Sequence, residues 1–121
     1  ILREWYPDEA FTGLEARDLS RAYDLGDEAA IKIMKRTGEV LGKGLAYAVT
    51  LFSPDIVIVG GGVAAAGDRL LNPVRSMMKK CLIEDYWNRI HVTSAQLGDD
   101  AGVIGSAWYA KERAGEQEYV R

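Results

Sequence analysis

Apolar and small side chains recur at steps of three and four residues along the first half of the chain. From Asp27, a natural N-cap, this spacing predicts one long amphipathic helix that ends at about Leu51. The predicted stripe of this helix consists of Ala30, Met34, Thr37, Leu41, Leu45, Ala48 and Phe52.

The residues before this helix are less regular. A short helix is predicted over Glu15–Leu25, with Gly26 as its C-terminal cap. Residues 1–13 show no clear period, so we expect an irregular segment there. We expect its aromatic side chains, which include Trp5, Tyr6 and Phe11, to pack on the rest of the protein.

Four large aliphatic residues, Ile56–Val59, run directly into the three glycines Gly60–Gly62. A half-exposed strand alternates polar and apolar residues, so this unbroken run predicts a short strand that is buried on both faces. A helix is predicted from about Val63. Strand, glycine turn and helix N-terminus together form a common nucleotide-binding geometry, because free amide groups and the helix dipole attract phosphate or ribose oxygens.

The second half of the chain alternates between helices and one more strand. Asn72 as N-cap and Pro73 at the first helical position predict a helix to about Leu82. We expect a polar and aromatic connection over residues 84–89, a strand over 90–96, a last helix from about 97 to 113 and a charged tail over 115–121. The predicted inner face of the first of these helices consists of Val74, Met77, Met78 and Cys81.

Three glycines inside the long helix require an explanation, because each costs about 1 kcal/mol relative to alanine. Gly38 and Gly42 lie on one face, one turn apart, while Gly44 lies elsewhere. We predict that another helix or a strand approaches closely at this face. A ligand at these glycines is the weaker alternative.

Composition narrows the function classes. The 121 residues fit one domain, and 15 Lys and Arg against 18 Asp and Glu leave no basic stripe for nucleic acid. The single cysteine, Cys81, excludes an internal disulfide and suits a reducing compartment, so we expect a cytoplasmic protein. The run Ile56–Gly67 is too short to span a bilayer, and we expect a soluble protein with no membrane contact. Because Ile1 is not a methionine, the chain is processed, trimmed or part of a longer polypeptide.

The residue types allow several interpretations of the glycines. One is a tight turn with no ligand. Another is a dinucleotide fold, since Gly60-x-Gly62-x-x-Ala65 fits the looser fingerprint. However, the acidic residues at the required spacing, Glu84 and Asp85, precede the next predicted strand instead of ending it. A P-loop is excluded by residue type, and His91 has no second His or Cys at metal-ligand spacing.

Three ordered blocks of sequence resemble one known family. They are LGKGLA (41–46), SPDIVIVGGGV (53–63) with Gly67-Asp68, and LGDDAGVIGSA (97–107). Together they resemble the C-terminal part of the ROK family of bacterial and archaeal sugar kinases and repressors. The resemblance implies an α/β chain with parallel strands and covering helices, forming the C-terminal part of an actin-like ATPase (ribonuclease H-like) domain.

The resemblance also implies a function. A glucokinase-like enzyme of this family transfers a phosphoryl group from ATP, with Mg²⁺, to a sugar hydroxyl, and we expect a homodimer. ATP lies in a cleft between two domains, and the resemblance places Gly60, Gly61, Gly62 and Val63 in the adenosine-side wall. The last helix returns toward the hinge.

Several parts of such a kinase have no counterpart in this sequence. These are the N-terminal phosphate loop, the catalytic aspartate, the sugar-binding residues and the cysteine-rich zinc motif. Asp99 and Asp100 match a helix-start element and not the general base. We therefore expect residues 1–121 to form a single partial domain, the nucleotide-side lobe, with no catalytic residue or metal ligand and no activity on its own.

Physical reasoning also predicts an incomplete domain. A strand that is apolar on both faces requires strands at both edges, and the sequence predicts only one other strand. The missing strands then belong to upstream sequence or to a partner chain. Two alternatives to a kinase remain: a sugar-responsive repressor of the same family, with a helix-turn-helix upstream, and a structural dimerisation domain, suggested by Tyr86 and Trp87.

Overall fold

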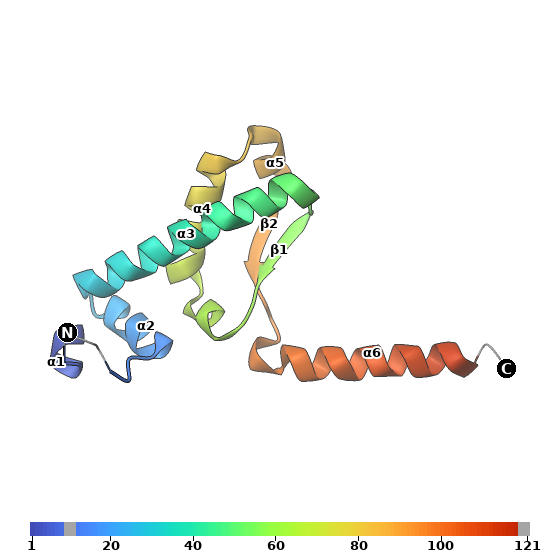
Figure 1. Ribbon diagram of the computed structural model, residues 1–121, viewed down its shortest axis with the longest axis horizontal. Helices are drawn as coiled ribbons and strands as arrows, with labels where there is room; N and C mark the ends of the chain where they lie inside the picture. The colour runs from blue at the N-terminus through green and yellow to red at the C-terminus, as the bar shows by residue number, and fades with distance from the viewer. Residues whose placement is uncertain (9–11, 119–121) are drawn as a thin grey trace.

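The protein is described by a computed structural model that covers residues 1–8 and 12–118. The helices are α1 (Leu2–Trp5), α2 (Ala16–Asp24), α3 (Glu28–Phe52), α4 (Asp68–Cys81), α5 (Glu84–Arg89) and α6 (Ala101–Glu118). The strands are β1 (Ile56–Val59) and β2 (His91–Ser94), and each is followed by a short 3-10 helix, η1 (Gly62–Ala66) and η2 (Gly98–Asp100). Figure 1 shows α3 crossing α4, the two strands beside this pair, and α6 extending away.

The long helix α3 confirms the predicted ends to within one residue. The Asp27 carboxylate caps it, because Oδ1 accepts a hydrogen bond of 2.9 Å from the amide of Ala30. Its second oxygen accepts from the amide of Leu2 at 2.9 Å and thereby holds α1 against the start of α3. These two backbone hydrogen bonds lower the pKa of Asp27 to about 2.

The buried stripe of α3 differs from the predicted one. Beyond Met34 the helix buries Gly38, Gly42, Ala46 and Val49, whereas Phe52 is 79% exposed. The prediction followed the large side chains, but the closest neighbour of α3 is α4, which packs on the glycines.

The glycines of α3 confirm the predicted close approach of a second helix. A Cβ atom at Gly42 would lie 2.6 Å from the carbonyl oxygen of Val74, and one at Gly38 would lie 2.6 Å from the Cβ atom of Pro73. Such distances leave no room for a side chain, so only glycine allows the two helices to meet here. Because α4 fills this space, the alternative of a ligand at these glycines is wrong.

The core lies between α3, α4 and one face of the sheet. Its buried members are Met34, Ala46, Val49, Ala66, Leu70, Val74, Met78, Leu82 and Val92. A smaller cluster joins α1, α2 and α3 through Leu2, Ala22 and Ala30. Trp5 is partly buried against this cluster, and the hydroxyl of Tyr6 donates to Asp18 at 2.7 Å.

Helix α4 begins at Asp68, four residues before the predicted N-cap Asn72, so that prediction is wrong. Pro73 lies inside the helix, where it lacks an amide hydrogen. Its ring packs on Gly38, which offsets the lost hydrogen bond. Cys81 is exposed at the end of the helix and is not part of the inner face, which also corrects the prediction.

Other predicted boundaries also change. Residues 2–5 form α1 instead of an irregular segment, and residues 84–89 form α5 instead of a connection. Helix α6 continues to Glu118, so most of the predicted charged tail is helical. Phe11 and residues 119–121 lie outside the described residues.

The two strands are parallel, and Val57 of β1 pairs with Val92 of β2. The prediction that β1 is buried on both faces is wrong for the described part of the chain. Val57 packs on the core, while Ile56 and Ile58 on the opposite face are 48% and 60% exposed. The helices α3 and α4 cover only the first of these faces.

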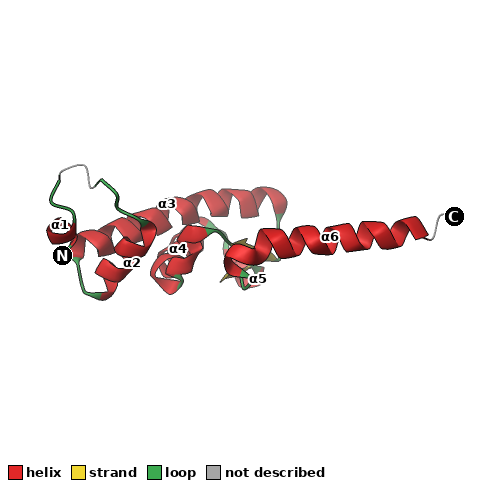
Figure 2. Cartoon of the chain, turned by 90° about the horizontal axis from the view of Figure 1, so that it is seen from below, coloured by secondary structure: helices red, strands yellow, loops and turns green. Residues whose placement is uncertain are grey.

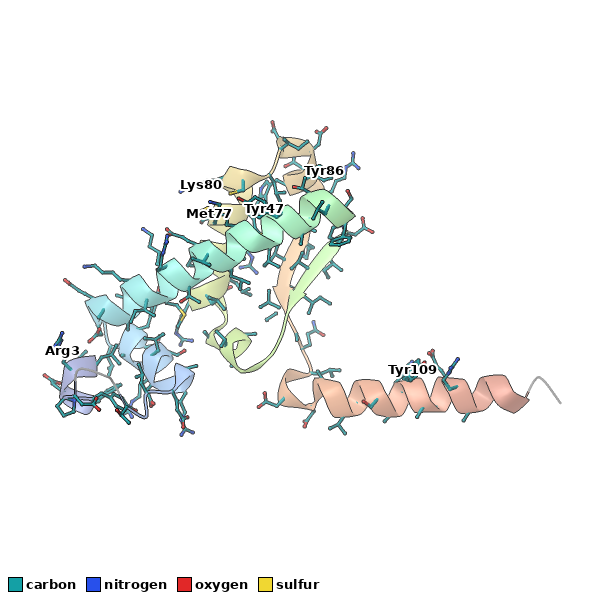
Figure 3. All side chains as sticks on the ribbon, viewed as in Figure 1. Arg3, Tyr47, Met77, Lys80, Tyr86 and Tyr109 are labelled. Atoms are coloured by element: carbon teal, nitrogen blue, oxygen red, sulfur yellow. The ribbon has the colours of Figure 1, made fainter. Side chains whose placement is uncertain are left out.

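Helix α6 packs on little of the rest of the chain. Figures 1 and 2 both show it extending away from the α3–α4 pair, and Figure 3 places Tyr109 on this extended part. Apolar side chains are exposed along it, and Val103 is 74% exposed. No helix in the described ranges combines the length and the apolar character that crossing a membrane requires.

Candidate functional site

The glycine turn begins where β1 ends, at Val59. The carbonyl of Val59 accepts a hydrogen bond of 2.9 Å from the amide of Ala95, which continues the strand pairing beyond β2. A Cβ atom at Gly60 would touch that of Ala95 at 3.5 Å. The first glycine is therefore held beside the neighbouring strand.

Gly61 has a backbone conformation that other residues avoid. Its φ is 85° and its ψ is 175°, a region occupied essentially by glycine alone. A Cβ atom at Gly61 or at Gly62 would meet nothing within 4 Å. Backbone conformation requires the glycine at 61, and both glycines leave bare backbone facing open space.

The segment after the glycines is helical, as predicted from about Val63, but it is the short 3-10 helix η1 and does not continue as an α-helix. The amide of Ala64 donates to the carbonyl of Gly61 at 3.0 Å, and the left-handed φ of Gly67, 59°, separates η1 from α4. A five-residue 3-10 helix offers few aligned peptide dipoles, so the predicted helix-dipole attraction for phosphate is weak here. The site offers a bare backbone surface instead.

A second loop lies beside the glycine turn. Because β1 and β2 are parallel, their carboxyl ends lie at the same edge of the sheet, and η1 and η2 contact each other there. Figure 1 shows η1 below the end of β1 and the start of α6 below the end of β2. In open α/β sheets, ligands bind outside the carboxyl ends of the strands. The fold therefore brings the second and third sequence blocks together.

The two loops are acidic and apolar. Between residues 60 and 68 and between 95 and 101, the sequence contains Asp68, Asp99 and Asp100 but no Lys or Arg. Val63 is 51% exposed and Leu97 is 52% exposed. Asp68 is paired with Arg75, but the exposed carboxylates of Asp99 and Asp100 would repel a triphosphate placed directly on their loop. This surface suits an apolar ring and hydroxyl groups, which donate hydrogen bonds to carboxylates.

Other parts of the described chain carry no comparable chemistry. Two hollows of about 340 and 320 Å³ lie between α3 and α4 and beside α5, away from the glycine turn. Among residues 1–8 and 12–118, no three His, Cys, Asp or Glu side chains are arranged to hold a metal ion. His91 is an exposed residue of β2.

Comparison with known proteins gives this geometry a context. The sequence model of the ROK family matches residues 2–113. The chain belongs to the ROK family. A glucokinase of Streptomyces coelicolor (strain ATCC BAA-471 / A3(2) / M145) is 37% identical over 101 residues, covering 83% of this chain and 32% of that protein. The chain thus spans about a third of the length of this relative.

A solved structure supports the family and the fold. It is a ROK family glucokinase from Streptomyces griseus in complex with glucose and AMPPNP, which is 34% identical with a TM-score of 0.80. The match covers 93% of this chain and 36% of that one. The α/β fold is therefore part of an actin-like ATPase domain, as the sequence predicts. A transcriptional regulator is also similar: the DNA-binding transcriptional dual regulator NagC of Escherichia coli (strain K12) is 26% identical over 90 residues, covering 74% of this chain and 22% of that protein.

Proposed function

We propose that the chain is the C-terminal, nucleotide-side lobe of an ATP-dependent, glucokinase-like carbohydrate kinase. In this proposal Gly60, Gly61, Gly62 and Val63 form the adenosine-side wall of the ATP cleft. The observation that carries it is the bare glycine backbone beside an acidic loop at the carboxyl ends of two parallel strands. The similarity to a glucokinase solved with AMPPNP supports the same assignment.

In this proposal the two loops bind the nucleotide and take no part in the chemical step. Bare backbone at Gly61 and Gly62 admits a flat ring at van der Waals distance, and Val63 adds an apolar contact. The carboxylates of Asp99 and Asp100 are exposed and can accept hydrogen bonds from hydroxyl groups such as those of ribose. These residues bind and orient the nucleotide, while the attacking sugar and the base that activates it lie elsewhere in the enzyme.

Magnesium and zinc do not fit the described residues. The described acidic side chains do not cluster into a metal site, and the sequence has a single cysteine. In the proposed enzyme, Mg²⁺ accompanies the phosphates of ATP, and any zinc is held upstream. In this proposal residues 1–8 and 12–118 supply neither the catalytic base nor a metal ligand.

The sheet edges indicate where the rest of the domain attaches. In the observed register the carbonyl of Val92 points away from β1, and it accepts hydrogen bonds from Nε and Nη2 of Arg75 at 3.2 and 2.9 Å. This arginine blocks the outer edge of β2. The backbone groups of Ile56 and Ile58 point to the opposite edge, where no described strand pairs with them. We infer that the remaining strands, from upstream sequence, join at β1.

A titration with AMPPNP tests the proposed site. Isothermal titration calorimetry of the full-length protein should show binding that weakens by about tenfold or more in Gly61→Val, because a β-branched residue is strained at the observed φ and ψ. Gly44→Ala is the matched control, since this exposed helix glycine also has no neighbour within 4 Å of a built Cβ atom. Unchanged affinity in Gly61→Val would exclude the glycine turn as the nucleotide wall.

Two alternatives to a kinase remain. The similarity to a DNA-binding regulator favours a sugar-responsive repressor as the second candidate, in which this region senses ligand and dimerises. A helix-turn-helix upstream and sugar-dependent binding to DNA would establish it, whereas sugar-dependent consumption of ATP would establish the kinase. A dimerisation domain without ligand predicts no shift in melting temperature on adding nucleotide. The homodimer and the cytoplasmic location stay predictions.

A further inference from the structure

The glycine turn depends on η1 for its position, because two of its three glycines contact nothing within 4 Å of a built Cβ atom. Helix η1 is held by two buried methyl groups, those of Ala64 and Ala66. Methyl groups of this size bury little area and exclude few alternative placements. A directional contact is needed to fix a five-residue segment whose two ends, Gly61 and Gly67, have positive φ values.

Arg69 provides such a contact. Its Nη1 donates to the carbonyl of Ala66, the last residue of η1, at 3.1 Å. Its Nε and Nη2 donate to the two carboxylate oxygens of Asp24, the last residue of α2, at 2.7 and 2.5 Å. One planar guanidinium thus joins three segments: α4, η1 and α2. A lysine cannot reproduce this arrangement, because its ammonium group has no fork of parallel donors.

We propose that Arg69 and Asp24 are positioning residues for nucleotide binding, which act by fixing η1 and with it the glycine turn. The inference rests on the proposed function of the turn. The side chain of Arg69 is 33% exposed and that of Asp24 is 53% exposed. Partly exposed ion pairs contribute little to global stability. The effect of breaking this one is therefore local to the turn and appears in nucleotide affinity more than in the melting temperature.

A second arginine of α4, Arg75, makes different hydrogen bonds. Arg75 donates to the carbonyl of Val92 on the outer edge of β2, to Asp68 at 3.0 Å and to Asn72 at 3.3 Å, and none of these hydrogen bonds reaches η1. Arg69 thus connects α4 to the segment after the glycine turn, whereas Arg75 connects α4 to the edge of the sheet. Only Arg69 is expected to change the nucleotide site.

The test compares Arg69→Lys, Asp24→Asn and Asp24→Glu in the full-length protein, with Arg36→Lys as the matched control. Arg36 lies on the exposed face of α3, 4.0 Å from Glu39. Calorimetry with AMPPNP should give a Kd raised about fivefold in Arg69→Lys and in Asp24→Asn. Asp24→Glu, which keeps the carboxylate, and the control should stay within about twofold of the wild type.

Kinetics and hydrogen exchange complete the test. The KM for ATP should rise in Arg69→Lys, while kcat and the KM for the sugar stay unchanged, and amide exchange should accelerate in the peptide that contains residues 60–67. Unchanged exchange, or a Kd for AMPPNP within twofold of the wild type, overturns the inference and leaves the Gly61→Val test of the site intact. If the wild type does not bind AMPPNP, the proposed function fails. Faster exchange would then show a purely structural role, which also contradicts the inference.

Discussion

Glycines meet two different requirements in two regions of this chain. Where α3 crosses α4, Gly38 and Gly42 are buried, and a Cβ atom at either would lie 2.6 Å from an atom of α4. After β1, Gly61 and Gly62 are exposed and have empty space around them. The first pair is required by packing, and the second leaves bare backbone that a ligand can contact. Glycine content alone does not mark a binding site; the surroundings of the missing Cβ atom decide.

The largest expected effect concerns the helix crossing. Gly42→Ala places a methyl group against the backbone carbonyl of Val74, so α3 and α4 have to separate. Overpacking of this kind costs about 1–3 kcal/mol and occasionally more, and we expect the upper part of this range. Urea unfolding of the full-length protein measures the loss. An unchanged free energy of unfolding would show that the two helices do not meet at Gly42.

The next effect separates stability from binding. Gly61→Val should weaken AMPPNP binding strongly but shift the melting temperature by less than about 3 °C, because an exposed loop can relax without disturbing the core. Gly42→Ala should instead lower the melting temperature strongly, while the molecules that remain folded bind AMPPNP with nearly unchanged affinity. A large loss of melting temperature in Gly61→Val would mean that the turn is a structural element like the crossing.

A smaller effect, of opposite sign, is expected at Gly44. This residue is exposed inside α3 with nothing near a built Cβ atom, so Gly44→Ala should stabilise the protein by about 1 kcal/mol. Thermal unfolding of the Gly44→Ala and Gly42→Ala variants, measured side by side, compares the effects of the two substitutions on the melting temperature. Destabilisation by Gly44→Ala would reveal a contact at this position in the full-length protein.

The smallest effect concerns the N-terminal cap of α3. Asp27 has a pKa lowered to about 2 by hydrogen bonds from Leu2 and Ala30, so its carboxylate stabilises the folded state above the unfolded pKa of about 3.9. The melting temperature of Asp27→Asn should be lower than that of the wild type at pH 5–7. This difference should shrink as the pH falls from about 4 to about 2. A difference independent of pH would show that the charge of Asp27 does not contribute.

The sequence predicts the elements that rest on local signals. Asp27 as a cap and the regular spacing after it predict α3 almost to the residue, and the aliphatic run before the glycines predicts β1. The partner of each element is not a local property. The buried stripe of α3 passes through Gly38 and Gly42 because α4 lies there, and no periodicity of large side chains can reveal that.

The position of Pro73 could not be predicted from local sequence either. Asn72 and Pro73 look like the start of a helix, yet α4 begins at Asp68. The proline is tolerated inside the helix because its ring packs on a glycine more than thirty positions earlier in the chain. Arg69 and Asp24, 45 positions apart, were not candidates from the sequence, since nothing in either local pattern indicates the other.

The sequence likewise predicts only part of the candidate site. The sequence identifies the glycine turn and the acidic loop as two separate blocks, and the parallel pairing of β1 and β2 brings them to one edge. The short 3-10 form of η1 was not predictable from its alanines, which favour an ordinary helix. This difference weakens the dipole argument for phosphate, and for that reason we propose an adenosine surface at the glycine turn.

Photo-crosslinking with an azido-adenine analogue of ATP tests the central claim most directly. After irradiation of the full-length protein and mass spectrometry of its peptides, adducts that excess ATP suppresses should map to the turn around Val63 or to the loop around Leu97. Gly61→Val should reduce them, and Gly44→Ala should not. Adducts that ATP suppresses but that lie only outside these two loops would contradict the assignment of the glycine turn to adenosine.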